Sequence, residues 1–284
     1  MSVVAETATR IGAQRRGGGA ARYLIGAICI ATVAVMLWPL VTSLLASIKP
    51  APEAAVAPPH YWPRELSVEN YLSVFTYQAG LANYVLNSLI VAGLTILFCL
   101  ALAIPAGYGL ARFDVPFKEA LFLLMLASMM IPYQALLVPL YLMFSSLKLA
   151  GTYVGLAIVH TILQLPFSIY LMRNSFEAIP RELEEAAVVD GCSSLQILRR
   201  IFVPLVLPGI VTVALFAFIM SWNEFIAALI FMSDEGSFTV PIMLTGVATG
   251  DFGTINWGAL QAGVIISILP CALVYVLLQK YYIS

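Results

Sequence analysis

Charged side chains are scarce in this sequence. Lys and Arg number 14 and Asp and Glu 15 among 284 residues, whereas 61% of the residues are hydrophobic. Soluble globular domains carry charge on roughly 25% of their residues, so this composition excludes an ordinary soluble domain. We expect no nucleic-acid partner.

Residues that carry catalysis or bind metals are equally few. The two histidines, His60 and His160, lie far apart, and the four cysteines are scattered, which indicates neither a metal site nor a disulfide framework. No glycine precedes a lysine anywhere, so the Gly-x-x-x-x-Gly-Lys-Ser/Thr phosphate loop is absent. We therefore expect no catalytic residue, cofactor or metal in this chain, and any nucleotide hydrolysis must come from another subunit.

Long apolar segments, by contrast, are abundant. A span of about 20 apolar residues crosses the ~30 Å hydrocarbon core of a bilayer, and backbone polar groups in lipid must be paired within the span, which requires helices. The predicted fold class is an all-α polytopic membrane protein with six transmembrane helices, in contact with membrane lipid. The predicted spans are residues 23–48, 84–111, 118–146, 150–173, 201–231 and 258–281, with a tail at 1–22 and outer loops at 49–83 and 232–257.

The distribution of cations predicts the orientation. If the N-terminus is cytoplasmic, eleven cationic residues fall in inner segments and three in outer segments, as the positive-inside rule requires. The first span is longer than the apolar region of a signal peptide, so we expect it to be retained as a helix. The inner residues are Arg10, Arg15, Arg16, Arg22, Arg112, Lys118, Arg173, Arg181, Arg199, Arg200 and Lys280, and the outer ones are Lys49, Arg64 and Lys148.

The outer segment 49–83 is rich in proline and aromatic residues. Trp and Tyr are favoured at membrane interfaces, so one interpretation is an aromatic anchor. The other interpretation is a docking surface for an external protein. Both stay open, and both can hold at once.

The third span contains Pro132 and Pro139, with Gln134 between them. Proline removes a helical hydrogen bond and bends the helix. Broken helices often border the substrate path of transporters, so Gln134 is a candidate for that path. A simple packing kink is the alternative.

Polar residues also mark the fourth and fifth spans. His160, Gln164 and Ser168 recur every four residues and share a helix face, which predicts either interhelical hydrogen bonds or a polar path. Glu224, next to Asn223, is flanked by apolar residues on both sides. We predict that Gln164, Asn223 and Glu224 contribute to a translocation path; alternatively, Glu224 reaches water at the outer interface.

The densest polar stretch is residues 180–200, which we call the polar segment. Seven charged residues lie between Arg181 and Arg200. Pro180 suits the first position of a helix, Gly191 suits a left-handed turn at its end, and Ser193 with Gln196 has the spacing of a capping box. The pattern predicts two short helices joined by a bend, outside the lipid.

The polar segment also carries a resemblance to a known family. Glu185-Ala186-Ala187, Asp190-Gly191, Ile201 and Pro204-Leu205 resemble the EAA signature of permease subunits of binding-protein-dependent, type I ABC importers. Pro105 to Arg112 and Trp222-Asn223-Glu224-Phe225 are similar to elements of the carbohydrate branch of this family, which includes importers of maltose, multiple sugars and glycerol 3-phosphate. The resemblance implies a subunit of the bacterial plasma membrane that imports a sugar or a sugar-like polyol phosphate by alternating access.

The resemblance also implies partners and roles. The polar segment would act as a coupling helix seated in a groove of a cytoplasmic ATPase, with the apolar face Leu183, Ala186 and Ala187 buried there. Glu185 and Asp190 would position it, and Gly191 would set its bend. The ATPase dimer would bind ATP and Mg, a second homologous permease would complete the path, and an extracytoplasmic solute-binding protein or lipoprotein would deliver the solute. An ion-coupled secondary transporter is the alternative function.

Overall fold

The computed structural model describes residues 18–56, 58, 60–249 and 255–281, and in these ranges the chain forms helices and no β-strand. Four helices are long and apolar enough to cross a membrane, and up to six spans result if each of two bent helix pairs counts as one. The predicted all-α fold class is therefore confirmed. The predicted tail at 1–22 lies mostly outside the described residues.

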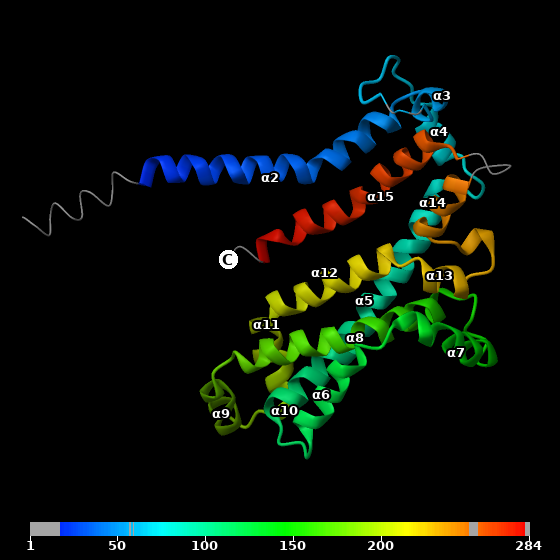
Figure 1. Cartoon of the computed structure of the whole chain (residues 1–284). Coiled ribbons are helices and arrows are strands. Elements are labelled where there is room, and N and C mark those ends of the chain that lie inside the picture. The colour runs from blue at the N-terminus through cyan, green and yellow to red at the C-terminus, as the bar shows by residue number, and fades with distance from the viewer. Residues whose placement is uncertain (1–17, 57, 59, 250–254, 282–284) are drawn as a thin grey trace, which may run out of the picture.

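The four long helices are α2 (Gly18–Ser47), α5 (Leu81–Arg112), α8 (Tyr153–Glu177) and α15 (Trp257–Leu278). Helices α5 and α8 pack along each other, and α12 (Leu207–Asn223) lies against both of them. Helix α2 runs beside α15 at one edge of the bundle, and its most apolar stretch buries no residue. Figure 1 shows the short helices α3 (Ala51–Ala54) and α4 (Glu69–Phe75) at one end of the bundle and α9 (Arg181–Val189) with α10 (Ser194–Ile197) at the other.

The third span is broken rather than straight. Helices α6 (Lys118–Ser128) and α7 (Tyr133–Ser146) meet at 96°. The amides of Met129 and Met130 each donate to a carbonyl three residues back, so the helix tightens and ends before Pro132. The residue before a proline disfavours helical geometry, which explains the position of the break. Pro139 lies inside α7 without interrupting it.

The fifth span differs from the single helix predicted at 201–231. A π-helical turn η1 (Leu198–Phe202) and the three-residue helix α11 (Val203–Leu205) precede a 77° bend into α12. Pro204 and Pro208 lack the amide that continues a helix, so the chain bends between them. Helix α12 ends at Asn223, and a separate helix α13 (Ile226–Phe231) follows after Glu224 and Phe225.

The range 232–257, predicted as an outer loop, contains a 3₁₀ turn η2 (Glu235–Ser237) and the apolar helix α14 (Val240–Thr249). The side chains of Asn83 and Asn87 hold this region to α5, because both donate to the carbonyl of Gly236. Its residues 250–254 lie outside the described part of the chain. The described part of the chain ends directly after α15 with a 3₁₀ turn, η4 (Gln279–Tyr281).

Candidate functional site

The polar segment folds as a helix, a tight bend and a second helix. Helix α9 starts directly after Pro180, which occupies the capping position rather than the first helical position. Gly191 has φ +80°, and the amide of Cys192 donates to the Ala187 carbonyl at 3.0 Å, closing the end of the helix. The Ser193 amide donates to Gln196 Oε1 at 2.8 Å, so Gln196 makes its half of the expected capping box.

The two faces of α9 have different environments. Ala187 is buried in the chain's own apolar core beside Phe176 and Phe202, at the end of α8 and in η1. Leu183 is 45% exposed and Val189 87% exposed. The expectation that Ala187 shares the partner-facing surface with Leu183 and Ala186 is therefore wrong. Helical spacing defines a face, but it does not tell whether that face meets the same chain or another one.

The remaining residues assigned to ATPase coupling are accessible. Glu185, Ala186, Asp190 and Gly191 are all exposed. They belong to α9 and the turn directly after it, which lie at one end of the bundle (Figure 1). Val188 and Leu195 add exposed apolar side chains that the sequence did not single out, at 59% and 62%. An exposed apolar surface with a charged rim is typical of a docking site for another protein.

Glu224 lies at the break between α12 and α13 and is 9% exposed. Its Oε1 accepts from the Ala227 amide at 2.8 Å and its Oε2 from the Ala228 amide at 3.0 Å, so the carboxylate caps α13. His160 Nε2 lies 3.3 Å from Oε2. A carboxylate that accepts from two backbone amides and has an imidazole nitrogen in contact is fixed in orientation. The alternative interpretation, that Glu224 reaches water at the outer interface, stays a prediction.

His160 connects Glu224 to the neighbouring helices. Its Nδ1 lies 2.8 Å from Ser221 Oγ, which in turn accepts from Thr95 Oγ1 at 3.4 Å. The predicted stripe His160, Gln164 and Ser168 is buried along its whole length. Polar side chains of α5, α8 and α12 thus meet in one buried network, as expected of polar groups inside a membrane bundle.

A cavity of about 420 Å³ opens beside Glu224, and we call it the Glu224 cavity. It lies where the break between α6 and α7 faces α8 and the end of α12. The carboxylate of Glu224 and the hydroxyls of Tyr133 and Ser128 are the polar side-chain groups on an otherwise mainly apolar wall. The lining residues are Ser128, Met129, Ile131, Tyr133, Leu136, Ile162, Leu163, Pro166, Met220 and Glu224.

The four residues predicted for a translocation path do not form one site. Asn223 is exposed, donates back to the Ile219 carbonyl at 2.7 Å, and lines a separate pocket beside Trp222 and Pro241. Gln134 is exposed on the first turn of α7, and Gln164 is buried in α8, and neither lines the Glu224 cavity. Because the helix breaks at Glu224, neighbouring side chains leave the chain in different directions, which sequence adjacency cannot reveal.

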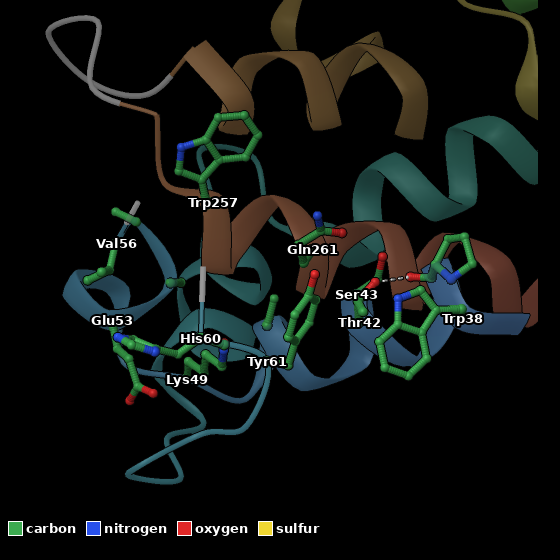
Figure 2. Close-up of a pocket in the computed structure, with 14 residues that line it drawn as sticks. Trp38, Thr42, Ser43, Lys49, Glu53, Val56, His60, Tyr61, Trp257 and Gln261 are labelled. Atoms are coloured by element: carbon green, nitrogen blue, oxygen red, sulfur yellow. Dashed lines mark hydrogen bonds between the residues drawn. The ribbon is translucent and has the colours of Figure 1, made fainter. Parts of the chain in front are cut away.

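A second pocket, the outer pocket, lies between α2, α3 and α15 and has a volume of about 610 Å³. Figure 2 shows Trp38, Tyr61 and Trp257 on its walls, together with Ser43 and Gln261. Trp38 and Tyr61 contact each other with ring centroids 5.7 Å apart. The pocket includes Tyr61 of the aromatic segment 49–83, whose two interpretations, an anchor and a docking surface, both stay predictions.

Sequence reasoning did not predict the contact between Arg112 and Glu184 at the α9 end of the bundle. It used Arg112 to orient the chain and as the last residue of a family-like stretch, and it gave Glu184 no role in the site. Arg112 Nη1 lies 3.6 Å from Glu184 Oε2. The sequence did contain one signal for a functional role of Arg112, which is its position as a lone cation at the end of a long apolar span. In the described ranges, no three His, Cys, Asp or Glu side chains approach closely enough to hold a metal ion.

Comparison with known proteins gives consistent matches over most of the chain. A family model described as "Binding-protein-dependent transport system inner membrane component" matches residues 103–282. The probable ABC transporter permease protein YurM of Bacillus subtilis is 38% identical over 79% of this chain and 74% of its own length. The sulfoquinovosyl glycerol transport system permease protein SmoH of Agrobacterium fabrum is 32% identical over 87% of this chain and 86% of its own.

A further relative is the diacetylchitobiose uptake system permease protein DasC of Streptomyces coelicolor, 30% identical over 93% of this chain and 96% of its own. Among solved structures, a chain of a bacterial ABC transporter involved in the import of the acidic polysaccharide alginate superposes with a TM-score of 0.78. That match covers 91% of this chain and 95% of the other at 21% identity, so it bears on the fold.

Proposed function

Because this chain belongs to the family of binding-protein-dependent transport system inner membrane components, we propose that it is the permease subunit of an ATP-driven carbohydrate importer of the bacterial plasma membrane. The observation that carries this proposal is the polar segment, a capped and bent helix pair that protrudes from one end of the bundle. Without a nucleotide site of its own, such a permease takes its energy from a separate ATPase dimer that binds ATP and Mg.

A sugar or a sugar-like polyol derivative is the proposed solute. The printed names of two relatives, SmoH and DasC, refer to sulfoquinovosyl glycerol and to diacetylchitobiose, both carbohydrates. A homologous second permease and an extracytoplasmic solute-binding protein or lipoprotein complete the proposed complex. The cation distribution supports a cytoplasmic N-terminus, and in that orientation the polar segment would face the ATPase.

We propose that the exposed face of α9 seats in the ATPase. Leu183, Ala186 and Val189 supply apolar area, and Glu185 and Asp190 fix the orientation at its rim. Gly191 sets the direction in which the chain leaves the contact. This is the helix-in-groove mode, in which the apolar face supplies affinity and the flanking charges supply register.

The Glu224 cavity is the proposed part of the solute path in this subunit. It borders two helix breaks, and irregular backbone at membrane depth is tolerated where it lines a cavity. The carboxylate of Glu224 accepts hydrogen bonds, as a sugar hydroxyl requires, and the Tyr133 ring offers a surface for a sugar ring. Gln134, Gln164 and Asn223 do not line this cavity and have no part in the proposed contact.

The experiment is co-purification in detergent from cells that express the neighbouring genes. Wild type should bring down an ATPase and a second permease, and Glu185→Lys should lose the ATPase while remaining inserted in the membrane. Uptake that survives loss of the ATPase and collapses with the ion gradient would instead support an ion-coupled secondary transporter, for which the Glu224–His160 pair offers a titratable group.

A further inference from the structure

We propose that Arg112 and Glu184 form the joint through which movement of the polar segment reaches the membrane helices. The proposal rests on the proposed function, since it assigns to these residues the transmission of the ATPase stroke. Arg112 is buried, and Glu184 lies at the edge of the surface proposed to touch the ATPase, where both residues line a surface pocket with Glu185 and Val189. Both act as positioning residues that hold α9 to the bundle.

Arg112 joins four segments of the chain. It is the last residue of α5, and its Nη2 donates to the carbonyls of Phe176 and Ile179 at the end of α8, at 2.5 and 2.6 Å. Its Nη1 lies 3.6 Å from Glu184 Oε2 in α9. Its guanidinium carbon stands 4.8 Å from the centre of the Phe202 ring in η1.

The contact between Arg112 and Glu184 is largely shielded from water. The Arg112 side chain is 3% exposed and that of Glu184 is 22% exposed. A guanidinium with so little access to water depends on its acceptors, because removing one leaves charge without compensation. The planar fork of arginine suits a site with several acceptors at fixed positions, which a lysine cannot satisfy.

A tyrosine ties Glu184 to α5 a second time. Tyr108 Oη donates to Glu184 Oε1 at 3.4 Å. The Tyr108 ring meets Phe176 and Phe202 edge-on, with centroids 5.7 and 5.6 Å away. Helix α9 is thus fixed to α5 through both oxygens of one carboxylate.

The segment between α9 and α12 is bent rather than straight. Gly191 at φ +80° and the π-helical turn η1 separate α9 from α12, with the 77° bend beyond them. Single π-helical turns are common at functional sites. Without the joint, a displacement of α9 would be absorbed in these bends; with it, the displacement pulls on the ends of α5 and α8.

The neighbouring residues Glu184 and Glu185 therefore have different proposed roles. Glu184 faces the chain's own core through Arg112 and Tyr108, whereas Glu185 is exposed toward the proposed partner. In the described part of the chain, the contact with Arg112 is the ion pair that joins α9 to another helix. Glu182, also exposed on α9, has no such contact and serves as a matched control.

The test uses the complete transporter, with its ATPase, second permease and solute-binding protein, reconstituted in vesicles. Uptake of labelled solute and ATP hydrolysis are measured on the same vesicles for wild type, Glu184→Gln, Tyr108→Phe and Glu182→Gln. We expect Glu184→Gln to retain the ATPase and to transport at least about tenfold less solute per ATP, within the 5–150-fold range of typical coupling effects. Tyr108→Phe should reduce the ratio less, and Glu182→Gln should leave it unchanged.

Other outcomes overturn the joint. If Glu184→Gln lowers uptake and hydrolysis in equal proportion, Glu184 only supports the amount of folded complex. If it releases the ATPase, Glu184 belongs to the docking surface. Should Glu184→Gln not fold, an unchanged ratio in Tyr108→Phe overturns the proposal as well. If wild type itself purifies without an ATPase, it is the proposed function that fails.

Discussion

Gly191 is the residue at which the polar segment reverses direction. Its φ of +80° is unfavourable for a side chain, although no atom lies within 4 Å of where a Cβ would stand. We expect Gly191→Ala to destabilise the helix end by about 1 kcal/mol, from backbone strain alone. Gly191→Asn should cost less, because asparagine tolerates this conformation.

The measurement for Gly191 is the yield of ATPase that co-purifies with each variant, together with the thermal midpoint of the permease. Alanine should lower both and asparagine should stay near wild type. Equal behaviour of the two variants would show that the left-handed turn is not needed for docking.

Glu224 holds a helix start that has no other cap. Glu224→Ala leaves the amides of Ala227 and Ala228 without their acceptor and His160 without its carboxylate. Unpaired buried groups cost roughly 1–3 kcal/mol each, so we expect about 3 kcal/mol of destabilisation. Asn223→Ala is the matched control, because that exposed side chain donates back to the Ile219 carbonyl of its own helix and does not cap α13, and a change within about 0.5 kcal/mol is expected.

Thermal unfolding of the detergent-purified permease compares the two variants. Solute uptake then separates the roles of the carboxylate, since Glu224→Gln keeps one oxygen acceptor for the α13 amides but loses the charge beside His160. A Glu224→Ala midpoint equal to that of Asn223→Ala would contradict the capping role.

At the scale of elements, the close contact of α5 and α8 depends on Gly107. A Cβ at this position would stand 2.6 Å from Met172 Cβ and 2.9 Å from the Arg173 amide nitrogen. Small residues allow such backbone approach in membranes, where packing drives helix association. We expect Gly107→Ala to cost about 1–3 kcal/mol by forcing the two helices apart.

Gly109, two residues on in the same helix, is the control. No atom lies within 4 Å of its hypothetical Cβ, so Gly109→Ala should be neutral or stabilising by up to about 1 kcal/mol. Folded yield and thermal midpoint in detergent distinguish the pair. Similar losses for both variants would mean that glycine matters here for reasons other than the α5–α8 contact.

The whole molecule presents two opposite ends, with the polar segment at one and the aromatic segment 49–83 at the other. Val189 is 87% exposed and Trp62 76% exposed, so cysteines placed there report on each side. In a background with Cys192 and the other native cysteines replaced, we expect a membrane-impermeant thiol reagent to label Trp62→Cys in intact cells. Val189→Cys should be labelled only after the membrane is opened.

The same cysteine tests the docking surface. Labelling of Val189→Cys in opened membranes should fall at least about tenfold when the ATPase is co-expressed, since a residue at the centre of an interface loses its access to water. Labelling from outside intact cells would reverse the proposed orientation. Unchanged labelling with the ATPase present would remove α9 from the interface.

The sequence alone determined the fold class and the bent helix pair at residues 180–200. Apolar length and the need to pair backbone groups in lipid impose helices, and proline, glycine and capping residues act within a few positions of themselves. Such local signals correctly placed the turn at Gly191. They also indicated a bend at Pro132 and Pro139, for which the sequence favoured a packing kink over a broken helix.

Which neighbour each side chain meets depends on how the helices pack. Ala187 turned inward to Phe176 and Phe202 while Leu183 stayed outside, and Glu224 joined His160 while Asn223 faced another pocket. Arg112 and Glu184 stand far apart in the sequence and meet because α5, α8 and α9 converge at one end of the bundle. Such contacts depend on the packing of distant segments, and no local pattern encodes a partner that the chain reaches only by folding.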